Sequence, residues 1–411
     1  MTTASIFEKY PEPALLRQEI VSADGQVLKV NGHFHTPFSF SAFSGIAQVF
    51  EMALQEKVKV LGINDFYTTG GYSEFSALAE KYRVFPLFNI EFMALQKDLQ
   101  AAGVRVNDPN NPGRTYFSGK GLKFPVSLDA SMTKRIRGVQ EESNRQTAEM
   151  TERLNGFLKE LGLDIRLPFR DIKTRYAKNL VRERHLAKAL RIAVADRFLT
   201  EAGQQAAFEK IFSGEKPKSA IDDAAGLENE IRGKLLKSGG KAFVPEDDKA
   251  FLSLEQVIEL IVHAGGIPCY PVLLDNGRGG FTDYEGDFGR LYDSLSGKNV
   301  WLLELIPGRN KPEILEDFVN FFHEKGFVIT FGTEHNTPRL DPLTVKGGDG
   351  KEISASMRKI GYEGACVLAA HQYLLARGES GYLDASGIAK TEQRKAFVAL
   401  GNAVIKHFVE A

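Results

Sequence analysis

The chain has 411 residues, of which 43% are hydrophobic and 26% are charged, and its formal net charge at pH 7 is -1. This composition is ordinary for a globular protein, and the near-neutral charge disfavours binding to a nucleic-acid polymer or an anionic membrane. A local basic patch could still recognise a small phosphorylated molecule.

The two cysteines, Cys269 and Cys366, are too few for a disulfide framework and form no Cys-x-x-Cys metal knuckle. The N-terminal segment contains charges and prolines but no apolar stretch long enough for a signal peptide. No later segment approaches the length of a membrane span. We therefore expect a cytoplasmic protein with buried thiols, whose oligomeric state the sequence leaves open.

Apolar runs at 28–35, 58–66 and 83–95 alternate with amphipathic stretches at 46–57 and 72–82. This β-α-β-α-β order predicts parallel strands joined by helical crossovers. The same alternation returns after residue 250, with helical patterns at 254–264, 288–296 and 313–326 and apolar runs at 265–274, 299–307 and 327–335. The two blocks together predict one α/β barrel, built from residues 1–96 and 251–340.

Residues 97–250 have a different pattern, which predicts a mainly helical insertion in the barrel. A Gly/Pro/Asn loop at 107–114 and a Gly-Lys loop at 118–125 precede long stretches rich in Arg, Lys and Glu. The Gly-Lys loop lacks the spacing of a nucleotide-triphosphate loop. Residues 341–411 contain two further helical patterns, which predict a C-terminal helical extension packed on the barrel.

The most informative segment is HFHTPFS at 33–39, which ends the first apolar run. Because strand side chains alternate between faces, His33 and His35 should reach into the same cavity. Neutral imidazole nitrogens bind zinc, iron or manganese, so this pair can form half of a metal site.

Other polar residues also occur at or near the ends of apolar runs. They are Asp65, Glu91, Glu304, Glu334 and His335. In a parallel α/β barrel, the C-terminal ends of the strands form the active-site face. Burying an imidazole or a carboxylate is costly unless it is paired or bound to a metal, so their convergence predicts a site. Glu304 could instead pair with a neighbouring lysine or arginine.

Five motifs, in this order and spacing, resemble those of the PHP (polymerase and histidinol phosphatase) superfamily: HFHTPFS, GINDF, PLFNIEF, GGIPCYP and FGTEHNTP. A sixth, VRERHLAKAL at 181–190, resembles a helix that brings a further metal ligand in some members with inserted domains. The resemblance implies a distorted seven-stranded, TIM-like (β/α) barrel that holds divalent ions, commonly in a phosphoesterase.

The resemblance assigns His33, His35 and Glu334 to a first metal, and Glu91 to a bridge toward a second metal that His185 also binds. Three positions depart from the family pattern: Phe66 and Tyr270 replace histidines, and Glu334 replaces an aspartate. The third metal site of the family should therefore be lost. We expect one or two divalent ions, and zinc, manganese and iron all suit these ligands.

The remaining candidates have roles around the metals. We expect Asp65 to orient a histidine, His335 to act as hydrogen-bond donor or general acid, and Tyr270 to bind metal weakly or orient the substrate. Three arginines are candidates for phosphate capture, because a guanidinium group matches phosphate oxygens bidentately. They are Arg184, Arg309 and Arg339.

The sequence thus predicts a metal-dependent phosphoesterase that hydrolyses a small phosphorylated molecule or nucleotide with metal-activated water. Two alternatives stay open. One is a different metal-dependent reaction on the same barrel, such as isomerisation or C–N hydrolysis, because two family histidines are replaced. The other is a catalytically inactive scaffold. The sequence does not identify the substrate.

Overall fold

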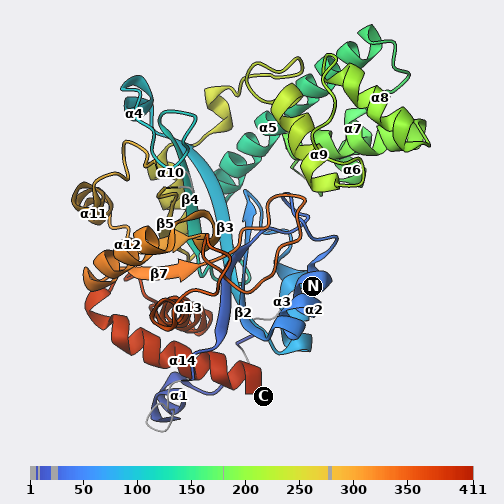
Figure 1. Ribbon diagram of the computed structural model, residues 1–411. Helices are drawn as coiled ribbons and strands as arrows, with labels where there is room; N and C mark the ends of the chain where they lie inside the picture. Colours follow the sequence, from blue (N-terminus) through green and yellow to red (C-terminus); the bar gives the residue numbers. More distant parts are fainter. Residues whose placement is uncertain (1–5, 8–9, 20–25, 179, 276–279, 411) are drawn as a thin grey trace.

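The computed structural model describes residues 6–7, 10–19, 26–178, 180–275 and 280–410. Seven strands form one sheet, in which each strand is paired with its neighbours in the chain. They are β1 (Lys29–Phe34), β2 (Val58–Phe66), β3 (Phe85–Leu95), β4 (Arg114–Lys120), β5 (Ile267–Val272), β6 (Leu302–Leu305) and β7 (Val328–Phe331). A parallel bridge between Phe34 and Glu334 joins the end of β1 to the segment after β7. The α/β fold is therefore built on a nearly closed, barrel-like sheet (Figure 1).

One strand departs from the predicted parallel arrangement. β4 runs antiparallel to both β3 and β5, with Ser118 opposite Glu91 and Lys120 opposite Ile267. This strand lies within the range 97–250 that the sequence assigned to the insertion. The loop expected at 118–125 is wrong for residues 118–120, which belong to β4. Gly119 and Gly121 flank Lys120, so the strand has too short an apolar run to be recognised from its periodicity.

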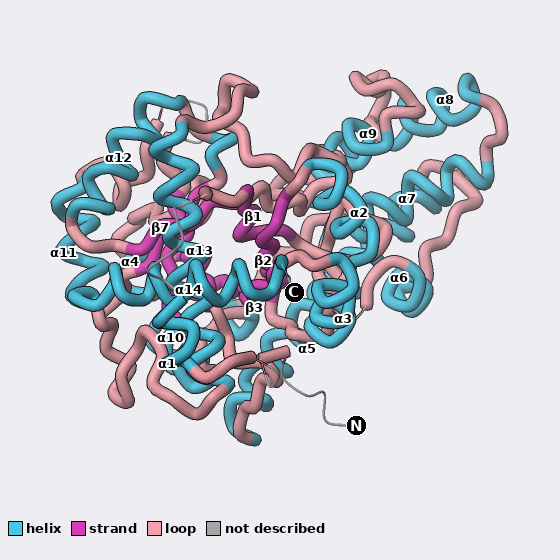
Figure 2. Tube along the Cα trace, turned by 90° about the horizontal axis from the view of Figure 1, so that it is seen from below, coloured by secondary structure: helices cyan, strands magenta, loops and turns pink. Residues whose placement is uncertain are grey.

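Helices surround the barrel, as seen from below in Figure 2. They are α2 (Ile46–Glu56), α3 (Tyr72–Tyr82), α10 (Leu254–His263), α11 (Phe288–Gly297) and α12 (Pro312–Glu324), all predicted from the sequence. In α2 the buried residues Ile46, Val49, Phe50 and Ala53 follow the spacing of one helix face. The shorter elements are α1 (Pro13–Glu19), α4 (Lys97–Ala101) and the 3₁₀ turns η3 (Asp248–Ala250) and η4 (Pro307–Arg309).

The helical insertion has a hydrophobic core of its own. It consists of α5 (Ala130–Glu160), α6 (Phe169–Arg175), α7 (Glu183–Arg197), α8 (Glu201–Ile211), α9 (Ala224–Ile231) and the π-helix η2 (Arg232–Leu236). The long helix α5 contributes Val139 to the barrel core, and Met150 and Leu154 to the core of the insertion. Thus α5 connects two separately packed bodies, and the insertion extends away from the barrel (Figure 1).

The C-terminal extension consists of α13 (Ala355–Ala376), the 3₁₀ turn η5 (Thr391–Gln393) and α14 (Arg394–Glu410). Gln372 of α13 bonds the backbone of Pro86 and Phe88 in β3. The helices α13 and α14 approach each other so closely that a Cβ atom at Gly401 would lie 1.7 Å from the carbonyl oxygen of Cys366. In the described part of the chain, no helix has the length and apolar character needed to cross a membrane.

His371 connects α13 to two other segments, and we expect it to make stability depend on pH. Its Nε2 donates to the carbonyl of Gly265 at 2.9 Å, and its Nδ1 accepts from the backbone N–H of Tyr382 at 2.8 Å. Burial lowers the pKa of His371 to about 4 from a usual 6.5. The neutral ring therefore stabilises the fold fully above pH 6.5, and this contribution of about 3 kcal/mol is lost as the pH falls toward 4.

The measurement is urea unfolding of wild type and His371→Gln at several pH values between 4 and 7.5. The wild type should lose its advantage over the variant as the pH falls through this range. Parallel stability curves for the two proteins would show that another group is responsible.

Candidate metal centre

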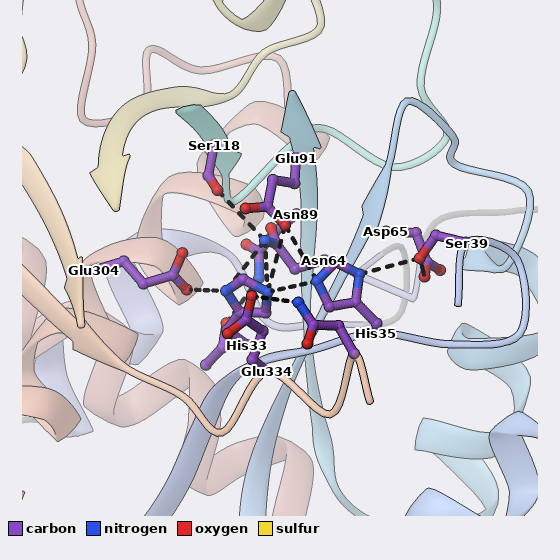
Figure 3. A network of polar contacts seen from close by, with 12 residues as sticks. His33, His35, Ser39, Asn64, Asp65, Asn89, Glu91, Ser118, Glu304 and Glu334 are labelled. Carbon is purple, nitrogen blue, oxygen red and sulfur yellow. Dashed lines mark hydrogen bonds and ion pairs between the residues drawn. The ribbon is translucent and has the colours of Figure 1, made fainter. Parts of the chain in front are cut away.

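Two imidazoles and one carboxylate meet inside the barrel. The Nε2 atoms of His33 and His35 are 3.2 Å apart, and Oε2 of Glu91 lies 3.7 Å from the first and 3.1 Å from the second. All three residues are buried. Figure 3 shows the two rings and the Glu91 side chain directed toward one another. Among the described residues, this is the group whose donor spacing suits a metal ion.

The local backbone explains why these side chains meet. His33 is in β1 and His35 follows it, so strand alternation directs both rings to the interior, as the sequence predicted. Glu91 is in β3 and pairs with Phe66 of β2. At the end of β7, Gly332 comes so close to β1 that a Cβ atom there would lie 2.3 Å from the Cβ of His33. A glycine is therefore needed for the strands to close around the site.

Each histidine is held through its other ring nitrogen. Nδ1 of His33 donates to Oε1 of Glu304 at 2.8 Å. Nδ1 of His35 lies 3.0 Å from Oγ of Ser39, which donates to Oδ1 of Asp65 at 2.6 Å. These partners direct the Nε2 atoms of both rings at the centre of the cluster, which is the arrangement found around metal-binding histidines. The amide nitrogen of Asn64 also lies 3.1 Å from Nε2 of His33 and donates to it.

The three donor atoms fit a divalent ion. Donors on a tetrahedral ion with bond lengths near 2.1 Å are about 3.4 Å apart, close to the separations observed here. Oε2 of Glu91 is buried without a hydrogen-bond partner among the described residues. Burial raises the pKa of Glu91 to about 7 and lowers that of His35 to about 3. Neutral imidazole is the form that binds metals, and a cation would offset the cost of burying the carboxylate.

A buried lysine lies next to this cluster. Nζ of Lys120 is 2.5 Å from Oε1 of Glu304 and 3.2 Å from Oδ1 of Asn64, and the lysine side chain is 0% exposed. Burial alone would raise the pKa of Glu304, but His33 and Lys120 hold it at about 2. The expectation that Glu304 pairs with a basic residue is confirmed, although the partner is 184 positions away in the chain.

Sequence reasoning missed three residues of this network: Ser39, Asn64 and Lys120. Ser39 and Asn64 are part of the motifs HFHTPFS and GINDF, beside residues that were selected. A lysine between two glycines inside a β-prone segment was the available signal for Lys120. These side chains become informative only when their partners on other strands are known.

Phe66 covers one side of the centre. Its ring stacks on His35 with centroids 5.0 Å apart and an interplanar angle of 22°. The guanidinium of Arg182 lies 5.6 Å from the centre of the Phe66 ring. An apolar ring thus occupies a position where another imidazole would offer a ligand.

A cavity of about 930 Å³ separates the barrel from the insertion, and His33, Glu91 and Glu304 form part of its wall. The rest of the lining mixes apolar, polar and charged side chains. The basic ones are Arg114, Arg182, Arg184, Arg232, Lys237 and Arg309, and the acidic ones include Asp108, Glu183, Glu246 and Glu334. The cavity wall thus combines the histidine cluster with basic side chains from both the barrel and the insertion.

Two of the proposed phosphate-binding arginines line this cavity. Arg184 lies over the ring of Phe40, at 5.6 Å, and contacts Asn229 at 3.4 Å. Burial lowers its pKa to about 10, so it stays charged at neutral pH. Arg309 forms an ion pair with Glu334. The third, Arg339, is mostly exposed and pairs with Asp341 at 2.9 Å, so the structure does not place it on the cavity wall.

Glu334 lies beside the centre without being one of the three clustered donors. Its carboxylate contacts Arg309 and accepts from Asn336 at 2.6 Å. Glu334 and His335 both have positive φ angles, 69° and 50°. Their backbone carbonyls accept hydrogen bonds from the N–H groups of His35 and Ala42.

Three other candidates have partners outside the cluster. His335 uses both ring nitrogens, toward Thr333 at 2.7 Å and the carbonyl of Asp341 at 2.7 Å. The hydroxyl of Tyr270 donates to Glu285 at 2.8 Å. Nδ1 of His185 accepts from the N–H of Arg182 at 2.9 Å, at the start of α7. In the structure these contacts stabilise a loop, the end of β5 and a helix terminus, respectively.

The link from Asp65 through Ser39 to His35 leads to a quantitative prediction. Ser39→Ala removes the acceptor that holds the ring of His35, and we expect divalent-metal affinity to fall about 10- to 100-fold. Isothermal titration with Zn²⁺ or Mn²⁺ measures this change. Ser44→Ala, in the same loop but bonded to Gln48 instead, is the matched control and should bind like wild type. Equal affinities in all three proteins would remove Ser39 from the site.

Comparison with known proteins gives structural likeness alone. No family model matches the chain, and no curated protein matches it in sequence. A protein from Bifidobacterium adolescentis, provisionally described as a metal-dependent phosphoesterase, superposes with a TM-score of 0.52 at 18% identity, covering 82% of this chain and 96% of its own. An amidohydrolase from Chromobacterium violaceum gives a TM-score of 0.49 at 17% identity, covering 80% and 96%. The first likeness supports the barrel fold.

Proposed function

We propose that this protein is a metal-dependent hydrolase with a PHP-like barrel, and that it acts as a phosphoesterase on a small phosphorylated molecule. The observation that carries the proposal is the convergence of His33 Nε2, His35 Nε2 and Glu91 Oε2 at 3.1–3.7 Å, with the two rings fixed by Glu304 and Ser39. These are the donors of a divalent zinc, manganese or iron ion.

When bound, such an ion polarises a phosphoryl oxygen and lowers the pKa of water toward neutrality. Residues of the chain set the protonation state and the orientation of the two histidines. Burial lowers the pKa of both imidazoles and so favours their neutral form. Glu304 and the Ser39–Asp65 pair hold the two rings in orientation, and Phe66 covers one side of His35.

The choice of a phosphate ester over other hydrolysable groups rests on the cavity wall. Arg184 has no acidic partner among the described residues and faces the cavity, where it can donate two parallel hydrogen bonds to phosphate oxygens. Arg309 can do the same if its contact with Glu334 opens. The neighbour described as a metal-dependent phosphoesterase shares the fold and agrees with this choice.

The test has two steps. Elemental analysis of protein purified without chelators should find divalent metal in wild type and almost none in a His33→Ala, Glu91→Ala double variant. The metal-loaded wild type should then hydrolyse members of a panel of phosphate esters, and amide and sugar substrates should stay intact. Turnover of an amide or a sugar alone would replace the phosphoesterase by another metal-dependent enzyme. A protein that binds no metal would be a scaffold.

A further inference from the structure

We infer that the ammonium group of Lys120 occupies the place of a second metal ion, so that the centre holds one divalent ion beside a fixed organic cation. This inference rests on the proposed metal centre and specifies its composition. In a two-metal hydrolase, two ions a few ångströms apart share carboxylates. Here the carboxylate of Glu304, which bonds His33, already has the ammonium group of Lys120 as its partner.

The contacts of Lys120 are those of a small hard cation. Nζ lies 2.5 Å from Oε1 of Glu304 and 3.2 Å from Oδ1 of Asn64, and both partners offer oxygen. Carboxylate and amide oxygens are the ligands that Mg²⁺ and Mn²⁺ prefer. Both side chains also contact His33: Glu304 bonds Nδ1, and the amide nitrogen of Asn64 lies 3.1 Å from Nε2. The ammonium group is therefore one side chain away from the proposed metal.

Burial fixes the position of this ammonium group. Lys120 and Glu304 are 0% and 1% exposed, so neither charge can turn to solvent. Lys120 enters from β4 at the level of Ile267, the first residue of β5, and reaches up the barrel interior to Glu304. A divalent ion placed on the same oxygens would face direct repulsion from this ammonium group. The ammonium group of Lys120 thus fills the position of the second cation.

The remaining carboxylates support a single ion. Glu91 provides the negative charge of the three-donor cluster, whereas Glu334 is paired with Arg309. Oε2 of Glu304 is buried and has no hydrogen-bond partner among the described residues. Once the ammonium group is removed, Oε2 of Glu304 and Oδ1 of Asn64 are therefore both available to a metal ion.

The experiment measures metal stoichiometry with Mn²⁺ in four proteins: wild type, Lys120→Arg, Lys120→Met and a Lys120→Met, Glu304→Gln double variant. Elemental analysis after gel filtration counts the ions, and electron paramagnetic resonance distinguishes an isolated Mn²⁺ from a coupled pair. Wild type and Lys120→Arg should hold one ion with an isolated signal. Lys120→Met should hold two with a coupled signal, and the double variant should return to one.

Several outcomes overturn the inference. Two ions in wild type would show that Lys120 does not exclude the second metal, and this result requires no variant to fold. One ion in a folded Lys120→Met protein would show that the ammonium group does not occupy a cation site. A wild type that binds no Mn²⁺, Zn²⁺ or Fe²⁺ would instead refute the proposed metal centre itself. Thermal melting adds an independent readout, since Mn²⁺ should raise the melting temperature of Lys120→Met more than that of wild type.

Discussion

Replacing His35 by alanine should abolish metal binding and reduce kcat/KM for phosphate-ester hydrolysis about 10³-fold or more, a loss of about 4 kcal/mol of transition-state stabilisation. His35 supplies one of three clustered donors, and its Nε2 lies 3.2 Å from that of His33 and 3.1 Å from Oε2 of Glu91. The two donors that remain cannot hold an ion tightly. The measurements are metal content by elemental analysis and kcat/KM with a substrate found in the panel.

His263→Ala is the matched control for this variant. His263 is on α10 on the outside of the barrel, and its side chain is 44% exposed. It should keep the metal content and activity of wild type. Full metal content and activity in His35→Ala would place the centre elsewhere, provided that the variant is folded.

The second large effect concerns stability. Lys120→Met should lower the free energy of unfolding of the metal-free protein by about 3–5 kcal/mol, because it leaves the Glu304 carboxylate buried without its cation. Glu304→Leu should cost a similar amount, because it leaves the ammonium group unpaired. The double variant should be much closer to wild type than the two single changes together predict, since an apolar pair needs no compensating charge.

Urea unfolding with chelator present measures these differences. The single tryptophan of the chain, Trp301, packs against the barrel core, with its ring 5.0 Å from that of Phe327. Its fluorescence therefore reports on the barrel and not on the separate core of the insertion. Additive losses in the double variant would show that Lys120 and Glu304 do not interact energetically.

Much of the barrel is predictable because its helices and parallel strands have strong periodic signals. The spacing of Ile46, Val49, Phe50 and Ala53 marks α2, and the uniformly buried β3 reads as a continuous apolar run. β4 was missed because its apolar run is short and ends at Gly119, and its strand character depends on pairing with β3 and β5.

At the candidate site, too, residues with a local sequence signal are predictable and residues that depend on long-range contacts are not. The pair His33 and His35 is evident from strand alternation alone, and Glu91 from its place in an apolar run. The partners that fix these residues come from distant segments, as Lys120 and Glu304 do, and no local pattern connects them. A motif also does not show whether a side chain already has partners: His335 has both ring nitrogens bonded, and Tyr270 is bonded to Glu285.

The antiparallel direction of β4 has a consequence for how this protein can be modified. In an all-parallel barrel, the reactive groups and the variable loops are attached to the same strand ends, so changing a loop disturbs the groups beside it. Here Lys120 comes from the opposite end of the barrel, and four of the basic residues that line the cavity, Arg182, Arg184, Arg232 and Lys237, belong to the insertion, which has its own core. The insertion can therefore be exchanged to alter ligand preference while the buried pair of Lys120 and Glu304 stays in place.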